Sequence, residues 1–172
     1  MRREILIIIG VAIIAVGIGA LIFLFGGGDA LNTRIATPDT NNSVSAVVVP
    51  FTEIRRGPQS TIEKRVNYFI TSHNQFGELW KIINATGTPP TIDFKTHSVV
   101  AVFAGEVPTS GYDIAVVKVE DADKRVVNIE LIKPDESCVL AQSLTTPYQV
   151  IELPKTSLPF THADTWTTKS CR

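Results

Sequence analysis

The longest apolar segment of the chain lies close to its amino end. Residues Ile5–Phe25 contain no charged side chain, whereas Arg2 and Arg3 stand directly before them. As a helix, this segment is about 31 Å long, which matches a bilayer core of about 30 Å. The pattern predicts a single transmembrane helix at residues 5–25. The two arginines place residues 1–4 in the cytoplasm by the positive-inside rule, so the rest of the chain is expected outside.

Three other interpretations of this segment are weaker. A cleaved signal peptide has a shorter apolar core and an A-x-A-like cleavage site, and the nearest match, Gly19-Ala20, lies within the apolar run. A lipoprotein anchor needs a cysteine near the end of the run, where the sequence has none. A buried helix of a soluble domain is normally shorter. An uncleaved signal anchor is therefore the favoured interpretation.

A polar segment separates the apolar run from the remainder. Gly26–Gly28 end the span, and Asp29–Ala46 is rich in Thr, Asn, Ser and Asp with no hydrophobic period. Such a composition buries too little apolar surface to offset the entropy of ordering. We predict a flexible linker at residues 26–46, with a typical reach of roughly 25 Å.

Residues 47–172 have the pattern of a β domain. Short segments with apolar runs or period-two alternation are separated by turn residues, and they cover residues 47–54, 65–71, 98–103, 112–119, 125–133, 148–153 and 161–171. Only one segment has a helical period, and no alternation of strands with helices is present. The expected fold is mainly β (α+β): an antiparallel β-sandwich or partly open barrel with one packed helix, preceded by the transmembrane helix.

The helix is predicted directly after residue 71. Ser72 and Gln75 have the spacing of a capping box. Four apolar residues follow at the i, i+3, i+4 and i+7 positions, namely Phe76, Leu79, Trp80 and Ile83. This face should pack on a sheet.

Composition and motifs argue against several classes of function. The formal net charge is −1, and no basic patch or basic helix points to nucleic acid. Nucleophile, zinc, calcium and phosphate-binding motifs are missing from the sequence, and its three histidines are scattered. We therefore expect no enzymatic activity, no metal, no cofactor and no small-molecule substrate.

The loop Ala104–Tyr112 joins two predicted strands. Pro108 fixes one turn position, and Gly111 can adopt a positive φ, so both are expected to be structural turn residues. This places Thr109 and Ser110 at a stiff tip, a form that suits binding of another protein. On the residues alone, a hairpin turn without a binding role is the favoured interpretation.

The chain contains two cysteines, Cys138 and Cys171. A disulfide between them is chemically permitted if the domain lies outside the cytoplasm. Two free thiols are the alternative, and the sequence alone leaves both possibilities open.

Three motifs in order resemble the carboxy-terminal domain of the protease complex subunit PrcB family. They are Gly105-x-x-Pro108-Thr109-x-Gly111-Tyr112, then Cys138-Val-Leu-Ala-Gln142-x-Leu144-Thr145-x-Pro147-Tyr148, then Leu153-Pro154-Lys155-Thr156. The helix motif Phe76-x-x-Leu79-Trp80 also fits, so the resemblance spans roughly Phe51–Cys171. The resemblance implies an extracytoplasmic, non-catalytic accessory or regulatory subunit of a surface or secreted protease complex.

A membrane-tethered protein-binding domain that acts on a protease is thus the first functional hypothesis. Its predicted contact surface consists of Thr109, Ser110, Tyr112, Pro147 and Tyr148, because tyrosines recur at interface hot spots. The second hypothesis is an inhibitor of chagasin-like type that inserts residues 108–112 into a protease cleft. An uncharacterised enzyme is the least favoured of the three.

Overall fold

A computed structural model describes residues 45–171 of the chain. The predicted transmembrane helix at residues 5–25 and almost all of the linker at residues 26–46 lie outside this part. The elements are β1 (Val47–Val48), β2 (Thr52–Gly57), β3 (Val66–Ile70), α1 (His73–Ile82), β4 (His97–Phe103), β5 (Asp113–Asp121), β6 (Arg125–Pro134), β7 (Tyr148–Pro154) and β8 (Phe160–Lys169).

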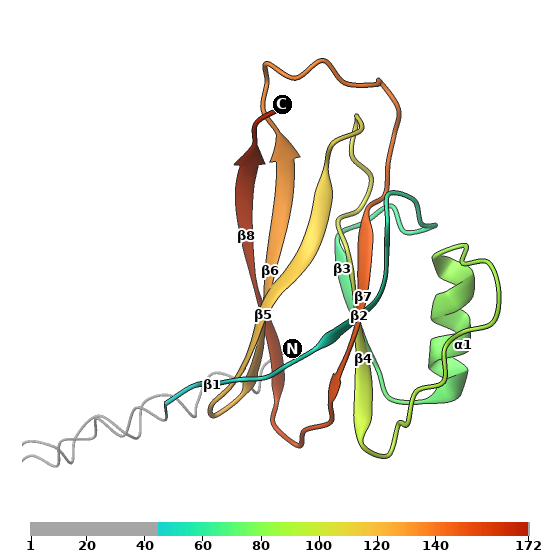
Figure 1. Cartoon of the computed structure of the whole chain (residues 1–172), viewed down its shortest axis with the longest axis vertical. Helices are drawn as coiled ribbons and strands as arrows, with labels where there is room; N and C mark the ends of the chain where they lie inside the picture. Colours follow the sequence, from blue (N-terminus) through green and yellow to red (C-terminus); the bar gives the residue numbers. More distant parts are fainter. Residues whose placement is uncertain (1–44, 172) are drawn as a thin grey trace, which may run out of the picture. The chain divides into compact units, whose positions relative to one another are not determined.

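The strands form two four-stranded sheets, which confirms the mainly β fold with a sandwich-like arrangement (Figure 1). The first sheet has the order β1-β5-β6-β8 and the second the order β2-β7-β4-β3, and no barrel closes. Helix α1 packs on the second sheet, which therefore lies between the helix and the first sheet.

Strand β4 explains this middle position. Val99, Ala101 and Phe103 belong to the cluster that includes helix α1, whereas Val100 and Val102 belong to the cluster between the two sheets. All five side chains are 2% exposed or less. A strand with apolar side chains on both faces must be buried on both, which is why residues 98–103 read as an unbroken apolar run.

The predicted helix is confirmed with its cap and its buried face. The Ser72 side chain accepts a hydrogen bond from the Gln75 backbone N–H. The Gln75 side chain in turn accepts one from the Thr71 N–H at 3.0 Å, one residue before the cap. All four residues of the predicted apolar face are buried at 9% exposure or less: Phe76, Leu79, Trp80 and Ile83.

The predicted antiparallel arrangement is confirmed for the other described strand pairs but is wrong for β8, which pairs with β6 in parallel along all ten residues. Strand β7 lies between them in sequence but belongs to the other sheet. The chain therefore reverses twice, once into β7 and once back, and β8 returns to the first sheet in the direction of β6.

The predicted first strand at residues 47–54 is divided into two. Val47–Val48 pair with β5 in the first sheet, and Thr52–Gly57 pair with β7 in the second. Pro50 lies at the crossing, where its missing N–H costs no ladder hydrogen bond. β1 and β2 are both edge strands.

Within residues 45–171, no helix is long and apolar enough to span a bilayer.

Candidate protein-binding surface

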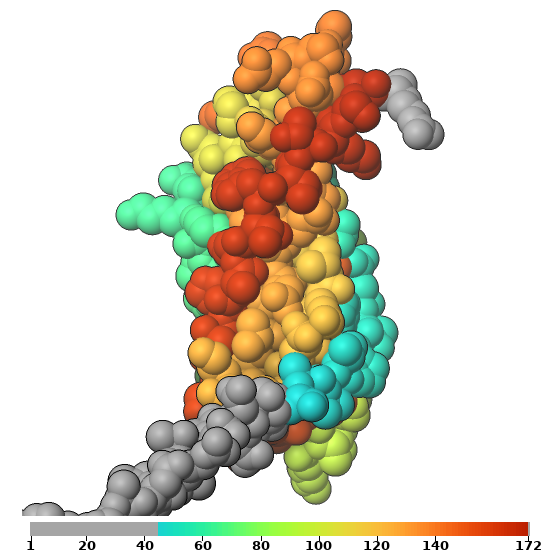
Figure 2. Space-filling view, turned by 90° about the vertical axis from the view of Figure 1, so that its left-hand side faces the viewer, coloured from blue at the N-terminus to red at the C-terminus, as the bar shows by residue number. Residues whose placement is uncertain are grey.

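Two loops that are far apart in sequence lie at the same end of the described domain. Residues 105–112 precede β5, and residues 135–147 connect β6 to β7 (Figure 1). We refer to these two segments together as the loop end. In Figure 2 the orange residues of the second loop project at one end, whereas the first described strand, in cyan, lies towards the other.

Backbone hydrogen bonds join the two loops. Val107 and Thr145 form an isolated antiparallel bridge, with N···O distances of 2.8 and 3.0 Å in the two directions. The Ser110 N–H donates to the Ala141 carbonyl at 3.1 Å. The Thr145 hydroxyl, on a residue that is 7% exposed, donates to the Thr109 carbonyl at 3.2 Å. The first loop is therefore supported by the second rather than standing free in solvent.

The second loop is also attached to the last strand. Cys138 and Cys171 form a disulfide with a Cα–Cα distance of 5.6 Å, which confirms this of the two alternatives. The Asp135 N–H donates to the Lys169 carbonyl at 3.0 Å, beside the bridge. Hydrogen bonds from the Ser137 hydroxyl and N–H lower the pKa of the Asp135 carboxyl, so this turn holds an ionised acceptor.

Of the five predicted contact residues, three lie at the loop end with partly exposed side chains. Thr109, Ser110 and Tyr112 are all half-buried. Pro147 and Tyr148 are buried, and Tyr148 is only 3% exposed.

Tyr148 has an interior role instead. Its ring stacks on Phe103 with 6.0 Å between centroids, and its hydroxyl accepts a hydrogen bond from Arg55 at 3.2 Å. As a correction to the sequence analysis, Pro147 and Tyr148 therefore do not contribute to an exposed contact surface.

Two exposed apolar side chains of the loop end were missed. Val139 is fully exposed and Leu144 is 59% exposed. Neither has a local signature, because an apolar residue in a short segment between turn residues is equally typical of a buried strand.

Gly111, predicted as a turn residue, connects the two loops at their base. Its φ of +92° is in the region that favours glycine. A Cβ at this position would lie 3.3 Å from side-chain atoms of both Leu140 and Pro134. Two hollows of about 420 and 630 Å³ adjoin Gly111 and share Lys169, and Tyr112 lines the first. Pro108, the other predicted turn residue, is exposed at the turn.

The described domain is thus a two-sheet β domain with a partly apolar, disulfide-linked surface at one end. The family model for the PrcB C-terminal domain matches residues 98–154, and this segment is identified as a PrcB C-terminal domain. The match runs from β4 to β7 and includes both loops of the loop end. It is shorter than the span Phe51–Cys171 expected from the motifs. No match was found among curated proteins or among solved structures.

Proposed function

We propose that this chain is a membrane-anchored, extracytoplasmic protein-binding domain that serves as a non-catalytic accessory subunit of a protease complex. The observation that carries the proposal is the loop end, where exposed apolar side chains stand on a backbone fixed by a disulfide and a β-bridge. A surface that is already ordered loses little entropy when a partner binds. Apolar and aromatic side chains are typical of the centre of a protein–protein interface, and the loop end presents both.

The disulfide supports the extracytoplasmic location. Disulfides persist in oxidising compartments and are rare in the reducing cytosol. The Cys138–Cys171 bridge closes over a sequence separation of 33 residues and ties a loop to a terminal strand. A structural role of this kind requires that the bridge remain oxidised.

The loop end and the start of the described chain are separated by about the length of β5. The described chain enters at β1, where Val47 pairs with Asp121 at the last residue of β5, whereas the loop end precedes Asp113 at its first residue. The nine residues of β5 span about 30 Å. The surface proposed to bind a partner is therefore remote from the first described residues.

Insertion of the loop into a protease cleft, the chagasin-like alternative, is less well supported. Such an inhibitor needs a protruding loop whose tip is free to enter a cleft. Here Thr109 and Ser110 are half-buried and hydrogen-bonded to the second loop through their backbones. A broad surface composed of both loops is the more natural contact.

A pull-down with the full-length protein in native membranes tests the proposal. Val139→Asp introduces a charge at the fully exposed apolar position and should reduce capture of the partner at least about tenfold. Val117→Asp is the matched control, because Val117 is also exposed, at 53%, but lies on β5 away from both loops. Equal capture by the two variants would contradict the assignment of the loop end.

A further inference from the structure

Strand β8 has one edge that no strand within residues 45–171 pairs with. It is ten residues long, and its one partner among these residues is β6. Natural proteins usually protect such an edge with proline, inward charges, a bulge or a covering segment. β8 contains no proline, and its only lysine is its last residue, Lys169. Its one inward carboxylate, Asp164, is already paired with Arg65 at 2.9 Å, so an edge of this length remains a template for another strand.

The backbone groups on the free edge can be assigned from the ends of the strand. The Pro159 and Lys169 carbonyls accept hydrogen bonds from Arg125 and Asp135, which lie on the side of β6. Because successive residues of a strand direct their backbone groups to opposite sides, the intervening even-numbered residues direct theirs outward. They are Phe160, His162, Asp164, Trp166 and Thr168.

The sequence of β8 is complementary to itself when read in the opposite direction about Ala163. An antiparallel copy would place aromatic beside aromatic, threonine beside threonine and imidazole beside carboxylate: Phe160 with Trp166, Thr161 with Thr165, and His162 with Asp164. Cross-strand pairs of these kinds are the favourable ones, whereas like charges in opposition are unfavourable. Two of these pairs, Phe160 with Trp166 and His162 with Asp164, consist of residues with outward backbone groups, so these two pairs would exchange backbone hydrogen bonds.

We propose that β8 is a self-association surface, through which two copies of this chain pair antiparallel about Ala163 and extend the first sheet across a two-fold axis. Self-complementarity of one surface is the defining feature of such an interface. The two loop ends would then face opposite directions, so each copy keeps its own loop end available. This association does not depend on the function proposed for the loop end.

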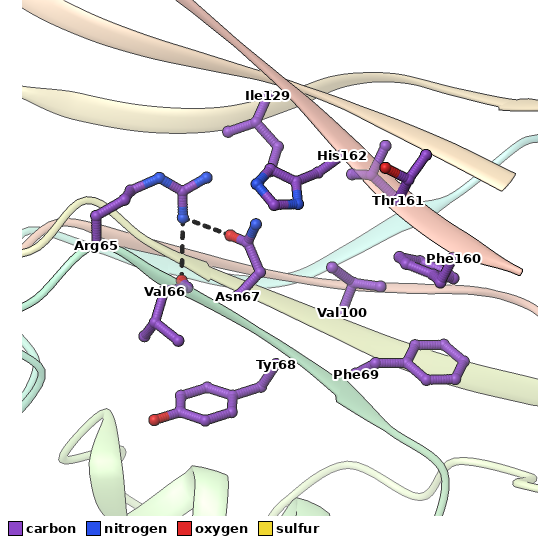
Figure 3. A pocket seen from close by; sticks show the side chains of 11 residues that line it. Arg65, Val66, Asn67, Tyr68, Phe69, Val100, Ile129, Phe160, Thr161 and His162 are labelled. Atoms are coloured by element: carbon purple, nitrogen blue, oxygen red, sulfur yellow. Dashed lines mark hydrogen bonds between the residues drawn. The ribbon is translucent and has the colours of Figure 1, made fainter. Parts of the chain in front are cut away.

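The groove beside β8 gives this edge a second, independent feature. Between β3 and β8 lies a cavity of about 400 Å³ with an apolar floor that includes Val100 and Ile129 (Figure 3). Phe69 and Phe160 meet at one end, with ring centroids 4.6 Å apart, and Phe69 is still 42% exposed. The mouth of this groove is therefore incompletely covered by residues 45–171.

Trp166 is the residue that a second copy would bring to this groove. It faces the inner side of the first sheet, beside buried Leu131, yet it is 61% exposed. The reason is that β3 begins at Val66 and does not extend as far as Trp166. Arg65, directly before β3, already lies opposite Asp164 and pairs with it at 2.9 Å. Pairing about Ala163 places Trp166 of the second copy beside Phe160. Exposed aromatic side chains from both copies are then covered together.

Disulfide trapping with the full-length chain in detergent tests the geometry. In the proposed pairing, the two Ala163 residues form a non-hydrogen-bonded pair with Cα atoms about 4.5 Å apart, within the range of a disulfide. An Ala163→Cys variant should form a covalent dimer under mild oxidation, because both native cysteines are already bridged. Thr167→Cys is the matched control: it is exposed on the same face of β8, but its two copies would lie about 26 Å apart.

The outcomes separate the possible occupants of this edge. A covalent dimer from Ala163→Cys, with none from Thr167→Cys, supports the pairing. Equal dimer yields would indicate random collision and overturn it. In intact cells, a crosslink of Ala163→Cys to a protein of a different mass would also overturn it, and would show that another chain occupies the edge.

A non-covalent measurement gives a second test. Ala163→Lys places two like charges in direct opposition at the two-fold axis and should weaken self-association about tenfold or more. Ala163→Ser should leave it unchanged. Because Ala163 is exposed, both variants should retain the circular dichroism spectrum of the parent chain. Unchanged dimer mass for Ala163→Lys by native mass spectrometry would contradict the proposal.

Discussion

Removal of the disulfide should cost the domain a defined part of its stability. The bridge joins residues 33 apart in sequence, and the loop-entropy relation gives a stabilisation of about 3–4 kcal/mol for a loop of this length. The loss falls on the whole domain because the closed loop contains β7, a central strand of the second sheet. We expect the double variant Cys138→Ala/Cys171→Ala to lose this amount in its free energy of unfolding.

Urea unfolding of residues 45–172, followed by tryptophan fluorescence, measures this change. Trp80 is 9% exposed in the helix-side core and should report the loss of packing. Ser170→Ala, beside Cys171 on an exposed position, controls for substitution at this end of the chain. A loss below about 1 kcal/mol for the double variant, with an unchanged denaturant slope, would refute the reasoning from loop closure.

Three further predictions concern single positions. Gly111→Ala should destabilise the domain by about 1–2 kcal/mol, because the backbone φ at this position is +92°. Gly77→Ala should instead stabilise it by about 0.5–1 kcal/mol, because Gly77 lies in the helix and no atom is within 4 Å of the new Cβ. Paired thermal melts measure both changes. Asp121 contacts the 2%-exposed Arg125 at 2.7 Å, and hydrogen bonds from that guanidinium lower the pKa of the Asp121 carboxyl. The depressed pKa means that this pair stabilises the fold above the unfolded-state pKa of about 3.9, and that the contribution is lost as the pH falls through the lower folded-state value. Asp121→Asn should therefore cost about 1.5–3 kcal/mol at pH 7 and should flatten the acid limb of a stability–pH curve; an unaltered limb would contradict the assignment.

Local patterns in the sequence were sufficient for the helix and for most strands. Ser72 and Gln75 satisfy the first turn through near neighbours, and the spacing of Phe76 and Leu79 defines one helix face. These signals lie within one or two turns of the chain. Their outcome does not depend on which distant segment packs against them.

The errors concern choices between distant partners. Nothing within Phe160–Lys169 indicates that its neighbour is β6 or that the pairing is parallel, because that depends on β7 joining the other sheet. Tyr148 reads as an amphipathic residue at a strand start, and only the nearby Phe103 and Arg55 explain its burial.

For the candidate site, the sequence located the region but not all of its surface. The turn residues Pro108 and Gly111 identified the first loop. The position of the second loop beside it follows from the Val107–Thr145 bridge, which joins residues 38 apart and has no local signature. Val139 could therefore be recognised as part of the surface only from the fold.

The most direct test of the central claim is photocrosslinking from the loop end in intact cells. A photoreactive residue at position 139 of the full-length protein should label one specific protein outside the cytoplasm, and the same residue at position 117 should not. Mass spectrometry of the labelled species should identify a component of a protease complex. If positions 139 and 117 give the same labelling pattern, or if the labelled proteins are cytoplasmic, the claim that this domain binds a partner through its loop end outside the membrane is contradicted.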